Sequence, residues 1–336
     1  MSERVHDLIV VGAGPTGIAL GAEAVQHDLD VLLVDKGALT QALLDFPTFM
    51  NFFTTRDLME IAGIPMSIPH DKPTRQDALA YFHSVAAHYK LPLALHEEVT
   101  DAHPEGDGFV LRTVQDGQPR ERRARAVALA TGYFNNPICL EVPGAELPWV
   151  HGYYRDPYRH FGEHVVIVGA GNSGCEAALE MYRNHVRVSV VHRGSEPKQS
   201  VKYWVKPDFL NRVSEGSISA YFEHVPVAFE DKPRGIRIRP LRGGEERFLA
   251  CDAAYTLVGF LTDVDLERRC GVRVDPRTLV PEFDPATCES NVPGLYIAGT
   301  LQAGSDTHAI FIENSRLHAP KIVKHLKGRL RSATAS

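Results

Sequence analysis

The sequence is poor in cysteine, has no long apolar run and carries no strong excess of either charge. Its five cysteines, Cys139, Cys175, Cys251, Cys270 and Cys288, form no Cys-x-x-Cys pair, which removes the usual dithiol redox motif and argues against a disulfide scaffold. No apolar segment is long enough to span a bilayer, and the first residues lack the basic lead-in of a signal peptide. We therefore expect a cytoplasmic protein with no membrane partner.

The charge balance gives no sign of a polyanionic partner. The formal net charge is −6, which disfavours nucleic acid as a ligand. The 16 histidines are scattered without the spacing of metal ligands, so we expect no metal site. With 336 residues, of which 44% are hydrophobic, the chain is long enough for two ordinary soluble domains.

What the sequence does contain is a strand, a glycine loop and a helix in direct succession near its start. Leu8-Ile-Val-Val11 is a continuous apolar run typical of a buried parallel strand, and it leads into Gly12-Ala-Gly-Pro-Thr-Gly17. An alanine-rich helix to about residue 26 and a second strand at 31–34 follow. This is the strand–loop–helix context in which a Gly-x-Gly-x-x-Gly loop binds a dinucleotide.

The same order of elements returns later in the chain. A strand at 165–168 leads into Gly169-Ala-Gly-Asn-Ser-Gly174, a helix and a strand at 188–191, and Gly169 stands 157 positions after Gly12. In such a unit the first glycine makes the tight turn, the second lets the backbone approach the pyrophosphate, and the third lets helix pack on strand. The pyrophosphate lies at the helix N-terminus, where unpaired N–H groups favour negative charge. The sequence therefore predicts two dinucleotide sites.

The residues that end the second strand of each copy distinguish the two ligands. The first copy ends on Asp35, whose carboxylate can accept hydrogen bonds from a ribose and repels a 2′-phosphate, as suits FAD. The second ends on His192-Arg193, followed by Lys198 and Lys202, and these cations suit the 2′-phosphate of NADPH. The alternative is that His192 and Arg193 are solvated loop residues, but no acidic residue takes the place of Asp35.

The rest of the pattern completes an α/β chain. A helix is expected from about Arg75 to Tyr89, with Thr74 and Asp77 as a capping box. Further strands are expected at 93–97, 109–113, 127–130, 219–223, 236–240, 248–258 and 295–299, and a terminal helix at about 307–324.

Because the strand at 295–299 must return to the first glycine loop, we expect two Rossmann-like dinucleotide-binding domains, with the NADPH domain inserted in the FAD domain. The predicted boundaries are 1–135 and 262–336 for the FAD domain and 136–261 for the NADPH domain. Hinges that let the inserted domain swing are expected near 135–137 and 260–262.

Two short segments resemble elements of two-dinucleotide flavoproteins. Ala130-Thr-Gly132 resembles the element that closes their FAD domain, and 291–299 resembles their C-terminal flavin element. With the glycine loops, these make the chain similar to the low-molecular-weight thioredoxin-reductase-like flavoproteins. Among them it most resembles the bacillithiol-disulfide reductase (YpdA-like) family. The resemblance extends over nearly the full length, through segments at 46–48, 52–53, 72–75, 130–133, 200–204, 303–306 and 310–314.

The resemblance implies an NADPH-dependent FAD enzyme that is cytoplasmic, homodimeric or homotetrameric, and reduces a low-molecular-weight disulfide. The residues assigned to FAD are Gly12, Gly14, Pro15, Thr16, Gly17, Asp35, Lys36, Phe46, Val99, Thr131, Gly132, Gly299, Thr300, Ala309 and Ile310. Those assigned to NADPH are Gly169, Gly171, Asn172, Ser173, Gly174, His192, Arg193, Lys198 and Lys202. A helix beginning near Thr307 would direct its N–H groups at the flavin. No side chain is assigned a catalytic role, because hydride transfer between stacked rings needs orientation.

Two positions depart from the family pattern. Thr16 stands where the family has a cysteine proposed to form a mixed disulfide with bacillithiol, and a threonine hydroxyl forms neither a thiolate nor a disulfide. Thr300 replaces an aspartate that contacts the ribityl chain in many relatives. Cys175, next to the second glycine loop, is expected to be a buried packing residue, and Cys139 is the other cysteine considered for a place near the flavin.

The electron acceptor therefore has four alternatives. The first is a small disulfide, as in the bacillithiol-disulfide reductases. The second is a ferredoxin or flavodoxin, because dithiol-free members of the superfamily reduce such proteins. The third is oxygen in a flavin monooxygenase, although the expected F-x-G-x-x-x-H element is absent from 149–156. The fourth is no acceptor at all, in a redox-sensing flavoprotein that signals through NADPH occupancy.

Overall fold

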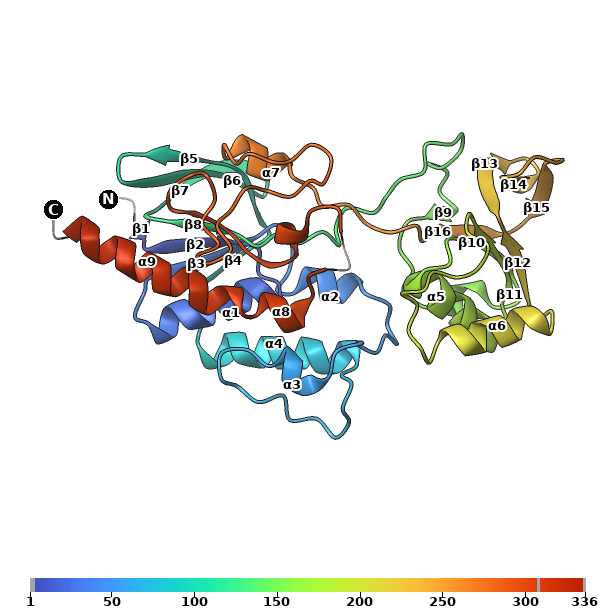
Figure 1. Cartoon of the computed structure of the whole chain (residues 1–336), viewed down its shortest axis with the longest axis horizontal. Coiled ribbons are helices and arrows are strands. Elements are labelled where there is room, and N and C mark those ends of the chain that lie inside the picture. Colours follow the sequence, from blue (N-terminus) through green and yellow to red (C-terminus); the bar gives the residue numbers. More distant parts are fainter. Residues whose placement is uncertain (1–3, 307–308, 335–336) are drawn as a thin grey trace. The chain divides into compact units, whose positions relative to one another are not determined.

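The computed structural model describes residues 4–306 and 309–334 and divides into two compact units. Unit 1 consists of Met1–Leu44, Met50–Asn136 and Leu261–Ser336, and unit 2 of Asp45–Phe49 and Pro137–Phe260. Unit 1 is built from both ends of the chain, and unit 2 is inserted in it (Figure 1). The chain passes between them at Asn136–Pro137 and Phe260–Leu261, and the short strap Asp45–Phe49 groups with unit 2.

The central sheet of unit 1 has five parallel strands in the order β17-β8-β2-β3-β4. In this order the strands are Leu295–Ile297, Val127–Leu129, Leu8–Val11, Val31–Asp35 and Leu93–Leu95. Every residue of β17, β8 and β2 is buried, as continuous apolar strands in a parallel sheet require. The predicted α/β class is confirmed.

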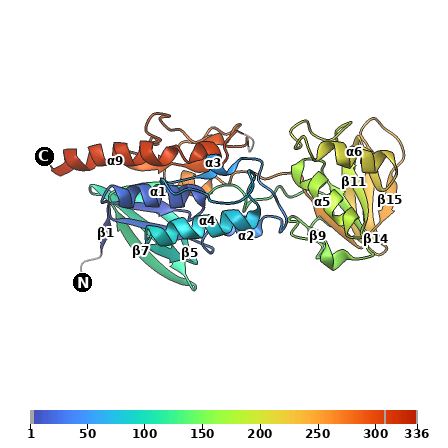
Figure 2. The same cartoon turned by 90° about the horizontal axis from the view of Figure 1, so that it is seen from below.

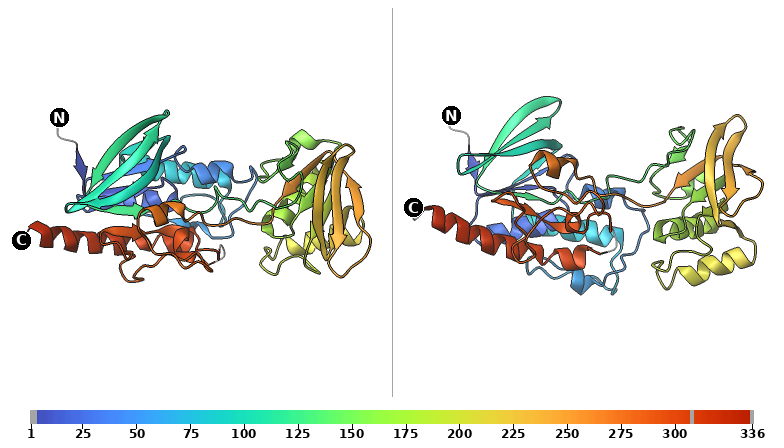
Figure 3. Two further views of the ribbon diagram at one scale, coloured as in Figure 1. Left: turned by 90° about the horizontal axis from the view of Figure 1, so that it is seen from above. Right: turned by 45° about the horizontal axis from the view of Figure 1, so that its top comes forward.

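A second sheet of unit 1, mainly antiparallel, has the order β1-β7-β6-β5 and is drawn with its long strands in teal in Figure 3. These strands are Val5–His6, Gln118–Ala124, Gly108–Gln115 and Glu97–Glu105. The sequence predicts only 109–113 of β6. Strands β5 and β7 escape prediction because much of their length is polar and exposed, so that pairing with β6 rather than hydrophobic periodicity defines them.

The helices outside the inserted segment are α1 (Pro15–Gln26), α2 (Gln41–Asp45), α3 (Arg56–Met59), α4 (Arg75–His88), α7 (Asp265–Arg269), η2 (Gly299–Ala303), α8 (Ile312–Ser315) and α9 (His318–Thr334). The capping box predicted for α4 is confirmed. The Thr74 hydroxyl accepts a hydrogen bond from the Asp77 N–H, and the Asp77 carboxylate accepts one from the Thr74 N–H. Helix α9 runs alongside α1 (Figure 2).

The terminal helix differs from its prediction. The expected first residue, Thr307, lies outside the described residues, and Ala309–Phe311 are not helical. Helical structure begins at Ile312 and is divided into α8 and α9. Pro320 has no N–H to donate to the carbonyl of Arg316, so a single continuous helix is interrupted here and proline falls in the first turn of α9.

Unit 2 repeats the parallel architecture. Its central sheet has the order β12-β11-β10-β16-β9, with strands Ile218–Phe222, Arg187–His192, His164–Val168, Ala253–Thr256 and Val150–His151. Its helical segments are η1 (Tyr158–His160), α5 (Asn172–Arg183) and α6 (Lys206–Ser214). Three antiparallel strands, β13 (His224–Asp231), β14 (Arg234–Pro240) and β15 (Arg247–Ala250), form a separate sheet, drawn in yellow and orange in Figure 3. Apolar residues of β10 and α5, among them Ile167 and Ala178, form the core between sheet and helix.

The single strand predicted at 248–258 is wrong. The segment contains β15 and β16, which belong to different sheets. Asp252 separates them by pairing with β10, since its N–H donates to the carbonyl of His164 and its carboxylate accepts from the His164 N–H, both at 2.8 Å. Across the described part of the chain, no helix combines the length and apolar character needed to cross a bilayer.

Candidate functional site

The residues predicted to bind FAD gather mainly at one edge of the central sheet of unit 1. Because β17, β8, β2 and β3 are parallel, their carboxyl ends share this edge. The segments that leave it are the first glycine loop, Thr131-Gly132, Gly299-Thr300 and Asp35-Lys36. The crevice outside the carboxyl ends of parallel strands is where α/β sheets bind nucleotides.

In the first glycine loop, the fold itself requires two of the three glycines. Gly12 has φ +111°, and a Cβ on it would clash with the carbonyl oxygen of Ala130. A Cβ on Gly17 would clash with the carbonyl oxygen of Gly12. Gly14 differs, because its φ of −81° suits any residue and no atom beyond its chain neighbours lies within 4 Å of where a Cβ would be. Glycine at position 14 leaves open a space beside Pro15, the first residue of α1.

The second glycine loop shows the same division of roles. Gly169 has φ +114° and its Cβ would clash with the carbonyl oxygen of Leu257, and a Cβ on Gly174 would clash with Gly169. Gly171 has φ −88°, and the nearest atom to its Cβ position is Cδ of Lys198 at 3.8 Å. An open second glycine at a helix N-terminus is what the approach of a pyrophosphate requires. Both loops therefore fit a dinucleotide.

The strand-end residues of the two units also occupy equivalent places. The Ala13 N–H donates to Asp35 Oδ2 at 2.7 Å, and the Ala170 N–H donates to His192 Nδ1 at 3.3 Å. His192 therefore supports the second loop as Asp35 supports the first. Burial, with Lys198 and other cations beside it, lowers the pKa of His192, so that the ring is neutral and able to accept this hydrogen bond.

The cations predicted for the 2′-phosphate are not equally available. Arg193 and Lys198 are exposed, and both act on the His192 ring. Lys202 is buried, and its Nζ lies 2.6 Å from Oε1 of Glu176. Positive charge at this strand end therefore comes mainly from Arg193 and Lys198, while His192 supports the backbone.

Asn172 holds the cationic segment against the second loop. Its Nδ2 donates to the carbonyl of Ser200 at 3.0 Å, and its Oδ1 accepts from the Lys202 N–H at 2.9 Å. The neighbouring Ser173 is exposed in the first turn of α5. Asn172 thus contributes by fixing the loop that carries the cations.

Three segments distant in the sequence meet at Thr16. The Thr16 hydroxyl donates to Oγ of Ser315 at 3.0 Å, which ties α1 to α8. Gly299 has φ +74°, and a Cβ on it would lie 3.0 Å from Thr16 Oγ1. Beside them, the Cβ position of Gly132 lies 3.7 Å from Thr300 Oγ1. The structure therefore brings the predicted flavin elements of both chain ends to one place.

The remaining residues assigned to FAD are placed less uniformly. Lys36 and Thr131 are exposed at the sheet edge, and Val99 is buried in β5. Ile310 is half-buried, just before α8, next to the exposed Ala309. Phe46 lies in the strap Asp45–Phe49, which groups with unit 2 rather than unit 1. The structure does not bring Phe46 together with the first glycine loop in one compact unit.

The four buried cysteines offer little nucleophilic character. Burial raises the pKa of Cys175, Cys251 and Cys270 to about 12 and also raises the pKa of Cys288. Such thiols are protonated at neutral pH and unreactive. Cys175 packs in the core of unit 2, as predicted, and Cys139 is exposed in unit 2.

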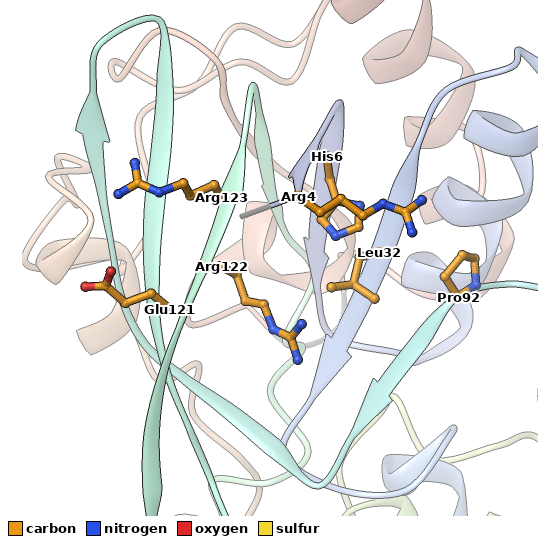
Figure 4. Close-up of a pocket in the computed structure, with 7 residues that line it drawn as sticks. All are labelled: Arg4, His6, Leu32, Pro92, Glu121, Arg122 and Arg123. Carbon is orange, nitrogen blue, oxygen red and sulfur yellow. The ribbon is translucent and has the colours of Figure 1, made fainter. Parts of the chain in front are cut away.

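One cavity of unit 1 lies away from this chemistry. It has a volume of about 290 Å³ and is lined by Arg4, His6, Leu32, Pro92, Glu121, Arg122 and Arg123 (Figure 4). Leu32 and Pro92 lie at the amino ends of β3 and β4, opposite to the edge that carries the glycine loop. Its cations are paired within the chain, for example Arg4 with Asp30 at 2.7 Å, so that this cavity is not the cofactor site.

Thr40 is a residue of the first site that the sequence analysis missed. It is fully buried with φ +59°, and its N–H donates to the carbonyl of Ala13 at 3.0 Å. The Lys198 N–H makes the equivalent bond to Ala170 at 3.0 Å. The internal repeat could have indicated Thr40 in the sequence, since Thr40 follows Asp35 by nearly the same number of residues as Lys198 follows His192.

The chain matches the model of the pyridine nucleotide-disulphide oxidoreductase family over residues 9–299. It is 30% identical over 324 residues to bacilliredoxin reductase Bdr of Bacillus subtilis, covering 96% of this chain and 97% of that protein. The solved structure of bacillithiol disulfide reductase Bdr (YpdA) from Bacillus cereus is similar with a TM-score of 0.93 and 29% identity, over 97% of this chain and 100% of the other. A ferredoxin–NADP reductase of Ignicoccus hospitalis is 23% identical over 305 residues, covering 88% of this chain and 90% of that protein.

Proposed function

Because the chain belongs to the pyridine nucleotide-disulphide oxidoreductase family, we propose that it reduces a low-molecular-weight disulfide of the bacillithiol type with electrons from NADPH. The chain is an oxidoreductase that uses FAD and NADPH. The observation that carries the choice of acceptor is the similarity to bacillithiol disulfide reductase over almost the whole length of both chains.

We assign the FAD site to unit 1. The chemistry that FAD would supply when bound is two-electron transfer between NADPH and the acceptor. The open position at Gly14 and the N–H groups at the start of α1 would hold the pyrophosphate. The Asp35 carboxylate, at the end of β3, would accept from the ribose while it holds the Ala13 N–H.

We assign the NADPH site to unit 2. Gly171 leaves the space in front of α5 open for the pyrophosphate. Arg193 and Lys198 would pair with the 2′-phosphate, which is the group that separates NADPH from NADH. His192 would support the second glycine loop by accepting from the Ala170 N–H.

Thr16 determines how electrons reach the disulfide. Its hydroxyl is hydrogen-bonded to Ser315 and forms no disulfide, so that no thiol of this loop takes part. We propose that the disulfide would be reduced without a protein thiol: the hydride that NADPH supplies provides two electrons and one proton, water provides the second proton, the S–S bond breaks and two thiols form.

The test is NADPH oxidation by the purified FAD-loaded protein. We expect oxidised bacillithiol, or the disulfide of a bacilliredoxin, to accelerate NADPH consumption above the rate with oxygen alone and to release two thiols per NADPH. Thr16→Cys restores the family's thiol beside Ser315 and should raise this rate. An unchanged rate with every disulfide, for both the wild type and Thr16→Cys, contradicts the proposed acceptor.

A ferredoxin is the second candidate acceptor. Two observations favour it: Thr16 in place of the cysteine, and the raised pKa of the four buried cysteines. Electron transfer from flavin to an iron–sulfur protein needs no thiol. The same assay with a ferredoxin in place of the disulfide distinguishes the two, since one acceptor should give the larger kcat/KM by a wide margin.

We also propose that the protein is a cytoplasmic homodimer or homotetramer. The support is the similarity to the bacillithiol disulfide reductases over the full chain. Light scattering of the FAD-loaded protein tests the oligomeric state, and a mass equal to that of one chain contradicts it.

A further inference from the structure

His318 is a buried residue next to the place where Thr16, Gly299 and Ser315 meet, and the sequence does not single it out. It is the first residue of α9, its exposed fraction is 8%, and its Nδ1 accepts a hydrogen bond from the Gly299 N–H at 3.0 Å. Because Nδ1 accepts, it carries no proton. The ring therefore holds the backbone of a segment that lies about twenty residues earlier in the sequence.

Gly299 is the point at which β17 passes into η2. It follows the carboxyl end of a strand at the sheet edge that carries the first glycine loop. Its positive φ and its closeness to Thr16 both disfavour a side chain at this position. The backbone at Gly299 is therefore constrained from two sides: Thr16 lies where a side chain on Gly299 would project, and His318 accepts a hydrogen bond from the Gly299 N–H.

The surroundings of His318 keep the ring neutral. Burial, with Lys321 on the same helix adding to it, lowers the pKa of His318 to about 4. The partners of the Gly299 turn, Thr16 and Ser315, do not titrate in this range. A position at the start of α9 also disfavours positive charge, because the helix dipole is positive there.

We propose that His318 is a positioning residue of the FAD site: its neutral ring fixes the Gly299 turn, and with it the backbone that follows, against the flavin. This inference rests on the proposed FAD site in unit 1. The residue that would hold the Gly299 turn, His318, belongs neither to the glycine loop nor to the C-terminal flavin element. Without His318 as its acceptor, the buried Gly299 N–H would need another hydrogen-bond partner, and the backbone at Gly299 would have to shift to reach it.

Two variants of the full-length protein separate positioning from mere packing. His318→Leu fills the space without an acceptor, whereas His318→Asn places its Oδ1 near the position of Nδ1 and restores one. We expect His318→Leu to raise the dissociation constant for FAD about tenfold or more and to alter the visible spectrum of the bound flavin. His318→Asn should return both to near the wild-type values. The readouts are FAD retained on purification, flavin fluorescence during titration of the apoprotein, and the spectrum.

The controls make each outcome informative. NADP⁺ binding, which we assign to unit 2, should be unchanged in both variants. If His318→Leu does not fold, His318→Gln replaces it, because the longer amide reaches the Nε2 rather than the Nδ1 position and should also bind FAD weakly. Wild-type FAD affinity and spectrum in His318→Leu or His318→Gln, or no rescue by His318→Asn, would overturn the inference. A wild-type protein that binds no FAD would instead overturn the proposed function.

Discussion

Gly14 and Gly171 are the two loop glycines that no contact within the protein explains. Each is the N-cap residue of the helix that follows its loop, with ordinary negative φ and an open Cβ position. Helix capping does not require glycine either, because serine and asparagine are preferred there. The remaining reason for glycine at these positions is that the protein backbone must come close to a ligand.

Serine at these two positions should therefore leave the fold intact and remove one ligand each. Serine can cap the helix, while its hydroxymethyl group fills the space that a pyrophosphate needs. We expect Gly14→Ser to be purified largely without FAD. Gly171→Ser should keep its FAD but raise KM for NADPH roughly tenfold or more. Flavin content and steady-state kinetics measure the two effects.

Gly17→Ser is the matched control for the first loop. A Cβ at this position meets the carbonyl of Gly12, so the apoprotein itself should lose stability, by about 2 kcal/mol or more. Urea unfolding of the apoproteins separates the cases. If Gly14→Ser is as unstable as Gly17→Ser, the open space at Gly14 has no relation to a ligand.

Arg193 should discriminate NADPH from NADH. It is exposed at the end of β11, and a hydrogen-bonded ion pair with the 2′-phosphate contributes about 1.5–3 kcal/mol. We expect Arg193→Ala to raise KM for NADPH about tenfold to a hundredfold and to leave KM for NADH unchanged. Parallel kinetics with the two nucleotides measure this. An equal loss with both nucleotides would place Arg193 outside the phosphate contact.

At the scale of elements, α7 carries an unusual internal acid. Glu267 in this short helix is fully buried, and its carboxylate oxygens have no hydrogen-bond partner among the described residues. Burial, with Asp263 and Asp265 adding to it, raises the pKa of Glu267 to about 7. A buried carboxyl without a cationic partner is held in its neutral form.

The contribution of Glu267 to the stability of unit 1 should therefore fall as the pH rises from about 4.5 to about 7. The unfolded chain ionises Glu267 near pH 4.5, whereas the folded chain keeps it neutral up to about pH 7. The stability that Glu267 contributes is thus fully present below the pKa of the unfolded chain. It has been lost once the pH has risen through the pKa of the folded chain. We expect Glu267→Gln, which does not ionise, to exceed the wild type by up to about 3 kcal/mol near pH 8. In urea unfolding near pH 4.5, Glu267→Gln should be little more stable than the wild type. An equal gain in stability at both pH values would contradict this account.

The elements also differ in how far sequence specifies them. Strands β2 and β10 and helix α4 follow from continuous apolar runs and a capping box, which are local signals. Strand β7 has no such local signal. Its charged residues pair with residues of other strands, as Arg122 does with Glu97 of β5 at 2.8 Å. The division of the terminal helix was missed although Pro320 marks it.

At the scale of the whole molecule, each unit has its own core. The core of unit 1 includes Ile9, Val11 and Leu295, and the core of unit 2 includes Val165 and Phe209. We assign one cofactor to each unit. A ligand that binds only folded protein stabilises the part that binds it, by about 2.7 kcal/mol at a hundred times its dissociation constant.

Thermal unfolding should accordingly show two transitions that respond to different ligands. We expect FAD to raise the transition of unit 1 and NADP⁺ to raise that of unit 2. Gly171→Ser should weaken only the response to NADP⁺. Differential scanning calorimetry of the apoprotein with each ligand makes the measurement. A single transition that both ligands raise equally would mean that the units unfold together.

The sequence by itself determined the two glycine loops and the family, and it predicted which ligand each loop binds. These follow from local sequence: a buried strand, a loop whose glycines have fixed roles, and a strand end at Asp35 or at His192. From the resemblance to that family we also expect Thr16 to stand at its cysteine position, which lies inside the loop motif.

Only the tertiary structure decided which side chains act together. His192 and Lys202 look like phosphate ligands in the sequence, but folding gives one to the Ala170 N–H and the other to Glu176. His318 meets Gly299 because parallel strand pairing returns the end of the chain to the first loop. Such partners are far apart along the chain, and no local periodicity encodes a contact that the sheet order creates.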